Sequence, residues 1–159
     1  MPDIARILKA DSPLTLARVA RGAQPLVLAD LARAAKGRAV FIVPDDTAMH
    51  AVSEAARYFA PELEVIEFPA WDSLPYDRAS PALSISARRL AALHRLQAGR
   101  PGAQLLVTTA NAVLQRVLTP FRIRESVREF APGMEIGRDS LAALLQRQGY
   151  SRTDTVIDK

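Results

Sequence analysis

The order of apolar and polar residues alternates between strand-like and helix-like patterns along the chain. Compact apolar runs rich in β-branched residues predict three strands, at 38–43, 63–68 and 104–109. Apolar residues at helical spacing predict one helix before the first of these runs and two helices between them, at about 25–36, 46–59 and 83–97. This alternation favours an α/β fold with parallel strands and right-handed crossovers, whose functional loops lie at the carboxyl ends of the strands.

Residues that start and stop helices support these boundaries. Asp45 or Asp46 is placed to cap the helix after the first strand, because a short carboxylate can accept a hydrogen bond from a free backbone N–H. Gly37 and Gly99 follow two of the predicted helices and favour their termination. The first strand, 38–43, is apolar on both alternating sets of positions, so we expect it to be covered on both faces.

Two shorter helices are expected at the margins of this pattern. Ser12 can cap a helix near the N-terminus, whose apolar side carries Leu14, Leu16 and Val19. Asn111 can cap another helix after the third strand, carrying Val113, Leu114 and Val117.

The pattern changes near Pro120, where we expect a domain boundary between residues 1–119 and 120–159. Residues 121–130 look extended, Asp139 can cap a helix, and a strand pattern begins at Thr153. One helix and two strand candidates enclose little core, and the last strand pattern is still running at the end of the sequence. We therefore expect a fragment that contains one lobe and the beginning of a second domain.

Composition and charge exclude several classes of protein. The 159 residues are 49% hydrophobic and 24% charged, which is typical of a globular chain and not of a disordered one. The longest unbroken apolar run, 39–43, is far shorter than a membrane span, so we expect a cytoplasmic protein. The net charge of +4 is spread along the chain, and the absence of cysteine excludes disulfides and thiolate sites.

The common nucleotide-binding motifs are missing. A Walker A loop requires Gly-Lys followed by a hydroxyl residue, and the sequence contains no Gly-Lys dipeptide. Gly22 precedes a predicted helix, but Pro25 stands where a backbone N–H donor would be needed. The strand that ends before Asp45 resembles a Walker B strand, but without a Walker A loop it is explained more economically as a buried strand followed by a capped helix.

An enzyme lobe, either a helicase-like NTPase domain or a magnesium-dependent receiver domain, remains an alternative. Asp45, Asp46 and Thr109 match parts of a magnesium-dependent receiver domain, in which acidic residues hold the metal beside an acceptor aspartate. The acceptor would have to follow the strand that ends at Phe68, where the sequence has Pro69. Bound nucleotide or metal would favour this alternative over a non-catalytic domain.

The segment 68–81 is the most unusual part of the chain. It holds the single tryptophan, Trp71, together with Tyr76 and three prolines, and it follows the predicted carboxyl end of a strand. Proline fixes φ, so such a loop loses little entropy when its side chains dock. We expect Trp71, Leu74 and Tyr76 to dock the loop against the domain. A platform for a nucleic-acid base or a partner protein is the alternative.

The same segment carries a family resemblance. Residues 67–77, Glu-Phe-Pro-Ala-Trp-Asp-Ser-Leu-Pro-Tyr-Asp, are followed by Ser-Pro at 80–81, by Ser-Ala-Arg-Arg-Leu at 86–90 and by a strand and helix within 105–119. This series resembles the N-terminal region of the bacterial transcription-repair coupling factors (Mfd), a module similar to the excision-repair protein UvrB.

The resemblance implies a division of roles. Residues 1–119 would form a degenerate RecA-like lobe without Walker residues, and residues 120–159 would begin a domain that recruits UvrA. The full-length family members are ATP- and magnesium-dependent DNA translocases that displace stalled RNA polymerase, using later domains. No catalytic, cofactor or metal residue is therefore expected in this fragment.

Six residues are candidates for interaction or for docking the loop: Trp71, Leu74, Tyr76, Asp77, Arg88 and Arg89. The family's main UvrA-contacting residues correspond to positions beyond Lys159, so none is carried over to this chain.

Overall fold

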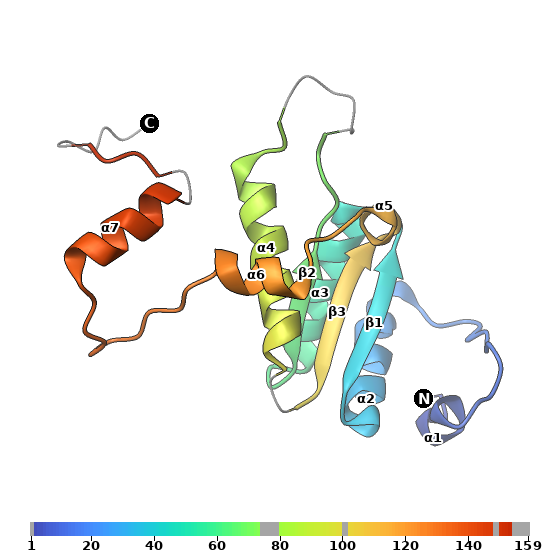
Figure 1. Cartoon of the computed structure of the whole chain (residues 1–159). Coiled ribbons are helices and arrows are strands. Elements are labelled where there is room, and N and C mark those ends of the chain that lie inside the picture. The colour runs from blue at the N-terminus through green and yellow to red at the C-terminus, as the bar shows by residue number, and fades with distance from the viewer. Residues whose placement is uncertain (1, 74–79, 100–101, 148–149, 154–159) are drawn as a thin grey trace. The chain divides into compact units, whose positions relative to one another are not determined.

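The structure of the protein is a computed structural model that describes residues 2–73, 80–99, 102–147 and 150–153 (Figure 1). The chain divides into two compact units, Met1–Thr119 and Pro120–Lys159.

The first unit is built around a parallel sheet. Its strands are β1 (Arg38–Val43), β2 (Glu64–Phe68) and β3 (Gln104–Thr109), in the order β1-β3-β2. Both strand pairs are parallel, so each connection crosses over the sheet. The predicted α/β fold with parallel strands is confirmed.

Helices cover the two faces of this sheet unequally. One face packs against α2 (Gln24–Ala35) and α3 (Asp46–Phe59), in a core that includes Val43, Val65 and Val107. The other face packs against α4 (Leu83–Ala98), whose Ala92 meets the β2 residues Ile66 and Phe68. Successive strand residues point to opposite faces, so α3 and α4 lie on opposite sides of β2 (Figure 1).

Two of the predicted helix boundaries are confirmed by local geometry. The Asp45 carboxylate accepts a hydrogen bond of 2.8 Å from the backbone N–H of Ala48 and caps α3. Gly99 follows α4 in the left-handed conformation, with φ of 57°, which glycine adopts without steric cost. In the part of the chain that the structure describes, no helix is long and apolar enough to cross a membrane.

The N-terminal prediction is wrong. The helix there is α1 (Ile4–Leu8), capped by the side chain of Asp3, and no helix begins at Ser12. Arg18 has a φ of 62°, and a left-handed residue cannot continue a right-handed helix. A 3-10 turn, η1 (Arg21–Ala23), then leads into α2.

The helix after β3 is α5 (Ala110–Leu114), and its cap also differs from the prediction. The side chain of Thr109, the last residue of β3, accepts from the backbone N–H of Ala112 at 3.2 Å. Asn111 is therefore inside the helix, which ends before Val117.

The second unit contains α6 (Pro120–Ser126) and α7 (Arg138–Arg147). The extended conformation predicted for 121–130 is wrong over the length of α6. Proline is favoured in the first helical turn, and an Arg122–Glu125 ion pair of 3.3 Å adds a local helical contact. Asp139 lies within the first turn of α7 rather than before it, and the strand expected from Thr153 extends outside the described residues.

The expectation that β1 is covered on both faces is also wrong. Val40 and Ile42 are 54% and 52% exposed, whereas Val43 is buried. Their side chains point to the same face as α4, and this helix packs over β2 rather than over β1.

Candidate functional site

A buried arginine organises the carboxyl end of β2. Arg89 of α4 is 2% exposed, and its guanidinium donates hydrogen bonds to the carbonyl oxygen of Pro69 and, at 3.1 Å, to Oε1 of Gln115. The guanidinium carbon lies 4.2 Å from the ring centre of Phe68 and 4.4 Å from that of Trp71. Two aromatic faces and two oxygen acceptors thus surround the cation.

These contacts explain how the charge is accommodated. Burial lowers the pKa of Arg89, since it disfavours the charged form. Arginine nevertheless stays charged at neutral pH, because a guanidinium group is not deprotonated in proteins. The negative faces of the Phe68 and Trp71 rings attract this charge where water is excluded. We call Phe68, Trp71, Arg89 and Gln115 the Arg89 cluster.

The Arg89 cluster and Asp72 fix both described ends of the unusual loop. The backbone N–H of Trp71 donates to Oε1 of Gln115 at 2.9 Å. The two carboxylate oxygens of Asp72 accept from the backbone N–H of Ala82, at 3.2 and 3.3 Å, next to the first turn of α4. Carboxylates stabilise helix N-termini, so Asp72 ties the start of the loop to the start of the helix.

The structure separates the predicted site residues into three groups. Trp71 and Arg89 come together in the Arg89 cluster. The neighbouring Arg88 points elsewhere and pairs with Glu67 at 2.8 Å. Three predicted residues lie outside the residues that the structure describes, namely Leu74, Tyr76 and Asp77.

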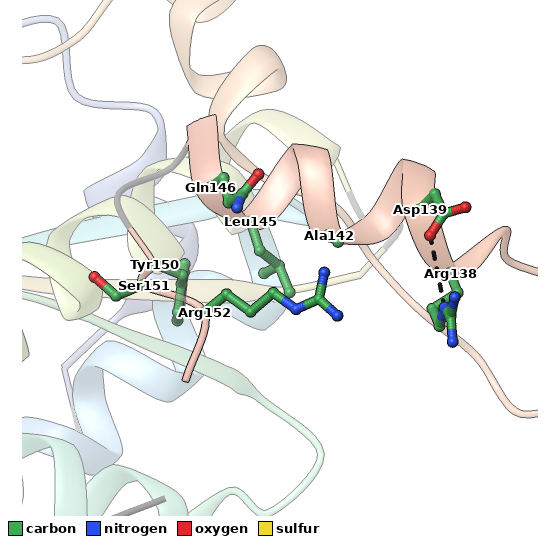
Figure 2. Close-up of a pocket in the computed structure, with 8 residues that line it drawn as sticks. All are labelled: Arg138, Asp139, Ala142, Leu145, Gln146, Tyr150, Ser151 and Arg152. Carbon is green, nitrogen blue, oxygen red and sulfur yellow. Dashed lines mark ion pairs between the residues drawn. The ribbon is translucent and has the colours of Figure 1, made fainter. Parts of the chain in front are cut away.

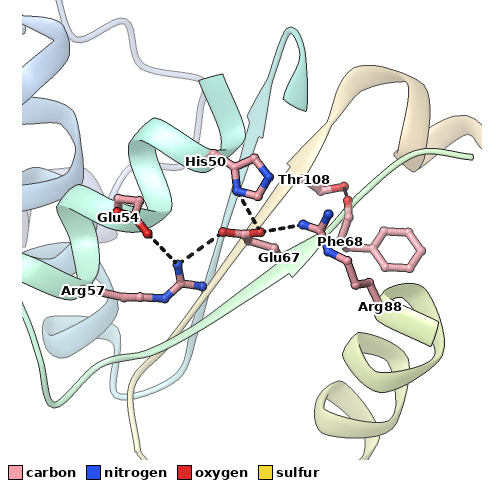
Figure 3. A network of polar contacts seen from close by, with 7 residues as sticks. All are labelled: His50, Glu54, Arg57, Glu67, Phe68, Arg88 and Thr108. Carbon is pink, nitrogen blue, oxygen red and sulfur yellow. Dashed lines mark hydrogen bonds and ion pairs between the residues drawn. The ribbon is translucent and has the colours of Figure 1, made fainter. Parts of the chain in front are cut away.

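Glu67 of β2 is the centre of a second polar cluster, which we call the Glu67 cluster (Figure 3). One of its oxygens lies 3.3 Å from Nδ1 of His50 and 2.8 Å from Arg88, and the other lies 3.3 Å from Arg57. His50 and Arg57 come from α3, whereas Arg88 comes from α4. The carboxylate therefore joins helices from both faces of the sheet.

Two opposing effects act on the pKa of Glu67. Partial burial raises it, but the interactions with His50, Arg57, Ser53 and Arg88 together more than compensate, so the pKa lies below its ordinary value of 4.5. A carboxyl group with a lowered pKa in the folded state stabilises the fold above its ordinary pKa. That stabilisation is lost as the pH falls through the lower, folded-state value.

Sequence reasoning did not select Glu67 or Gln115 as site residues. Glu67 had a signal, since a charged residue inside the apolar strand Val65–Phe68 needs partners when it is buried. No sequence signal identified Gln115, because its position beside Trp71 depends on the path of the chain after α5.

A groove of about 620 Å³ lies beside the carboxyl end of β1. Its walls are mostly apolar and come from α2, β1 and α3, and its polar lining includes Arg21, Gln24 and Thr47. Asp45, also at the groove, is engaged in capping α3. Among the described residues, no three His, Asp or Glu side chains are grouped closely enough to hold a metal ion.

The second unit has a smaller cavity of about 320 Å³ (Figure 2). It is bounded by α7 and the segment 150–152, and Leu145 points toward that segment. Arg138 and Asp139 form an ion pair of 3.6 Å at one end, with both side chains more than 90% exposed. An exposed ion pair of this kind contributes little energy. The lining of this cavity therefore does not indicate a catalytic or binding site.

The chain is similar to several proteins that share one name, transcription-repair-coupling factor. No family model matches the chain. The chain is 28% identical over 122 residues to the transcription-repair-coupling factor of Escherichia coli and 29% identical over 119 residues to that of Haemophilus influenzae, matches that cover 77% and 75% of the chain. It is 36% identical over 94 residues to the Myxococcus xanthus transcription-repair-coupling factor, covering 59% of the chain.

These matches span only a small part of the relatives. The chain covers 10% of the E. coli and H. influenzae proteins and 8% of the M. xanthus protein. Over most of its own length the chain is similar to transcription-repair-coupling factors, which confirms the family resemblance predicted from the sequence.

Proposed function

We propose that this chain is the N-terminal, non-catalytic interaction module of a transcription-repair coupling factor. The observation that supports the proposal most is its similarity to several curated proteins of that name over 59 to 77% of its length. The missing Gly-Lys dipeptide supports the non-catalytic role, since a Walker A loop needs this lysine to reach the phosphates of ATP.

In this proposal the first unit acts as a scaffold. The Arg89 cluster and the Asp72 cap hold the ends of the loop 69–82 against the domain, at the sheet edge where related folds place functional loops. The second unit, Pro120–Lys159, would be the beginning of a domain that recruits UvrA.

The activity belongs to the longer polypeptide. We propose that the complete protein is a cytoplasmic, ATP- and magnesium-dependent DNA translocase that displaces stalled RNA polymerase and hands the lesion to excision repair. ATP, magnesium, DNA and RNA polymerase would then bind to parts outside this chain.

The test compares the chain with the product of its complete reading frame. RNA polymerase is stalled on a DNA template by nucleotide omission, and its release is followed by gel shift with and without ATP. We expect the complete product to release the polymerase only with ATP, and the 159-residue chain to release none and to hydrolyse no ATP. Failure of the complete product contradicts the family function, whereas hydrolysis by the chain alone contradicts the non-catalytic role.

A capture experiment tests the proposed partner. The 159-residue chain should capture purified UvrA poorly, and a chain extended through the whole second domain should capture it well. Equally strong capture by the two would contradict this and would mean that the UvrA interface lies within residues 1–159.

A further inference from the structure

The connection between α5 and the second unit is tied to the first unit by Gln115. α5 lies at the carboxyl ends of the strands (Figure 1), and Ala112 is its buried residue. Leu114, at the end of this helix, is 85% exposed. The next residue, Gln115, is half-buried and turned toward the Arg89 cluster. Residues 116–119 follow without regular structure and lead to the second unit.

One atom of Gln115 accepts two hydrogen bonds. Its Oε1 accepts from the backbone N–H of Trp71 at 2.9 Å and from the guanidinium of Arg89 at 3.1 Å. Trp71 belongs to the start of the loop after β2, whereas Arg89 belongs to α4. Three segments that are far apart in the sequence therefore meet at a single oxygen atom.

A second contact joins the same part of the chain to the end of β2. The hydroxyl of Thr108 donates to the carbonyl oxygen of Phe68 at 2.8 Å. Thr108 lies just before α5 and Gln115 directly after it, so both ends of α5 are joined to residues 68–71. Thr108 is also held by strand pairing with β1 and β2. Gln115 is therefore the end of α5 that opens more easily.

Release of Gln115 would disturb both of its partners. Arg89 is 2% exposed, so water does not readily replace the acceptor that its guanidinium would lose. A buried donor left without an acceptor is more costly than an average hydrogen bond is stabilising, above all when the donor is charged. The start of the loop at Trp71 would have to move for these groups to become hydrated. The loop and the connection should therefore open together.

We propose that Gln115 couples the start of the loop after β2 to the connection at 116–119. With Gln115 docked, both segments are held, and with Gln115 released, both are free. The second unit is attached through this connection, so movement of that unit reaches Trp71. Coupling between two sites is reciprocal, so a change at the loop also reaches the connection. The inference concerns contacts within the first unit and does not depend on the proposed function.

Three substitutions at Gln115 separate its hydrogen bonds from its volume. Gln115→Glu keeps an acceptor oxygen beside Arg89, Gln115→Leu keeps the size without an acceptor, and Gln115→Ala removes both. Gln146→Ala, at an exposed glutamine of α7, is the matched control. Each variant is made in the 159-residue chain.

Two measurements follow the two coupled segments. The emission of Trp71, the single tryptophan, reports on the start of the loop. Trypsin cleavage after Arg116, quantified by mass spectrometry, reports on local opening of the connection. Cleavage after Arg128, in an exposed stretch of the second unit, is the internal reference. Cleavage after Arg57, within α3, detects unfolding of the whole first unit.

We expect Gln115→Ala and Gln115→Leu to red-shift the emission and to accelerate cleavage after Arg116 about fivefold or more relative to Arg128, because local opening becomes easier. Cleavage after Arg57 should not change, and Gln115→Glu should behave like the wild type. Wild-type behaviour of Gln115→Leu would overturn the inference, since volume alone would then hold the connection. Release in Gln115→Glu, or equal acceleration after Arg57, would also overturn it.

Asp72→Ala tests the coupling from the side of the loop. Asp72 accepts from the backbone N–H of Ala82, and among the described contacts none joins it to residues 115–119. We expect Asp72→Ala to red-shift the emission of Trp71 and to accelerate cleavage after Arg116 about twofold or more, because the coupling is reciprocal. Unchanged cleavage after Arg116, with or without a shift in emission, would overturn the coupling.

Discussion

The two edge strands of the sheet, β1 and β2, differ in the side chains that they expose. At β2, the Glu67 cluster and the Glu64–Arg95 pair bring charges from two helices across the outer strand. At β1, apolar side chains are exposed and an apolar groove runs alongside. Paired charged residues thus protect the edge at β2, whereas apolar residues leave the edge at β1 exposed. The side chains of an edge strand therefore indicate whether the sheet ends there.

The segments that follow the carboxyl ends of these two strands also differ in how tightly they are held. After β2 the chain enters a loop held by the Arg89 cluster, in which a buried cation, two rings and an amide make specific contacts. After β1 the chain passes from Pro44 into α3 beside an open groove. Stability should therefore depend strongly on the contacts of the loop after β2 and weakly on the exposed face of β1, which carries Val40 and Ile42.

The largest expected difference is between two residues at the same register. Ile66→Ala should lower the free energy of unfolding by about 4 kcal/mol, because it removes a fully buried side chain and leaves a cavity. Val40→Ala should change it by less than about 0.5 kcal/mol, because Val40 is already half in water. Urea denaturation followed by circular dichroism measures both, and similar losses would contradict the unequal covering of the sheet.

The next largest effect concerns the Arg89 cluster. Trp71→Ala should lower the free energy of unfolding by about 3 kcal/mol, since it removes a half-buried ring from the guanidinium of Arg89. Tyr58→Ala, which removes an exposed ring, is the control. Trp71 is the single tryptophan, so its emission reports on this cluster alone. Red-shifted emission, free access to quencher and unchanged stability of Trp71→Ala would show that the ring is not docked.

A smaller, pH-dependent effect is expected at Glu67. Glu67→Gln should lower stability at pH 7 by roughly 1 to 2 kcal/mol, since it removes a carboxylate that pairs with three side chains. The wild-type chain should lose this contribution below about pH 4.5, as the pH falls through the lowered pKa of Glu67. The variant should lack that part of the acid dependence. Glu54→Gln, at an 81% exposed side chain, should behave like the wild type.

The smallest effect is expected at the open edge. Ile42→Lys should change the free energy of unfolding of the 159-residue chain by less than about 0.5 kcal/mol, because the side chain is half exposed and can keep its charge in water. It should also reduce any self-association seen by sedimentation velocity, since an edge lysine discourages strand pairing. A loss of more than about 2 kcal/mol would show that Ile42 belongs to a packed interior.

The sheet and its main helices could be predicted because their signals are local. Apolar runs identified β1, β2 and β3, and the Asp45 cap and Gly99 marked helix boundaries. The covering of β1 could not be predicted in this way. Val40 and Ile42 have the sequence pattern of a buried strand, and their exposure depends on which strand α4 packs against.

The candidate site was predictable only in part. Composition drew attention to Trp71, and the family resemblance drew attention to Arg89. Their contact, and the part played by Gln115, follow from tertiary packing between segments far apart in the sequence. The error at 121–130 has a local cause, since Pro120 starts a helix there and the β-branched and aromatic residues that follow favour strands only weakly.

Hydrogen exchange of the native 159-residue chain tests the contrast between the two edges most directly. Local opening is easiest where few apolar contacts cover the backbone, so the amides of β1 and β2 report on how firmly each edge is closed. We predict that the amides of β2, residues 64–68, exchange at least ten times more slowly than those of β1, residues 38–43. Equal rates, or slower exchange in β1, would contradict the account of a closed and an open edge.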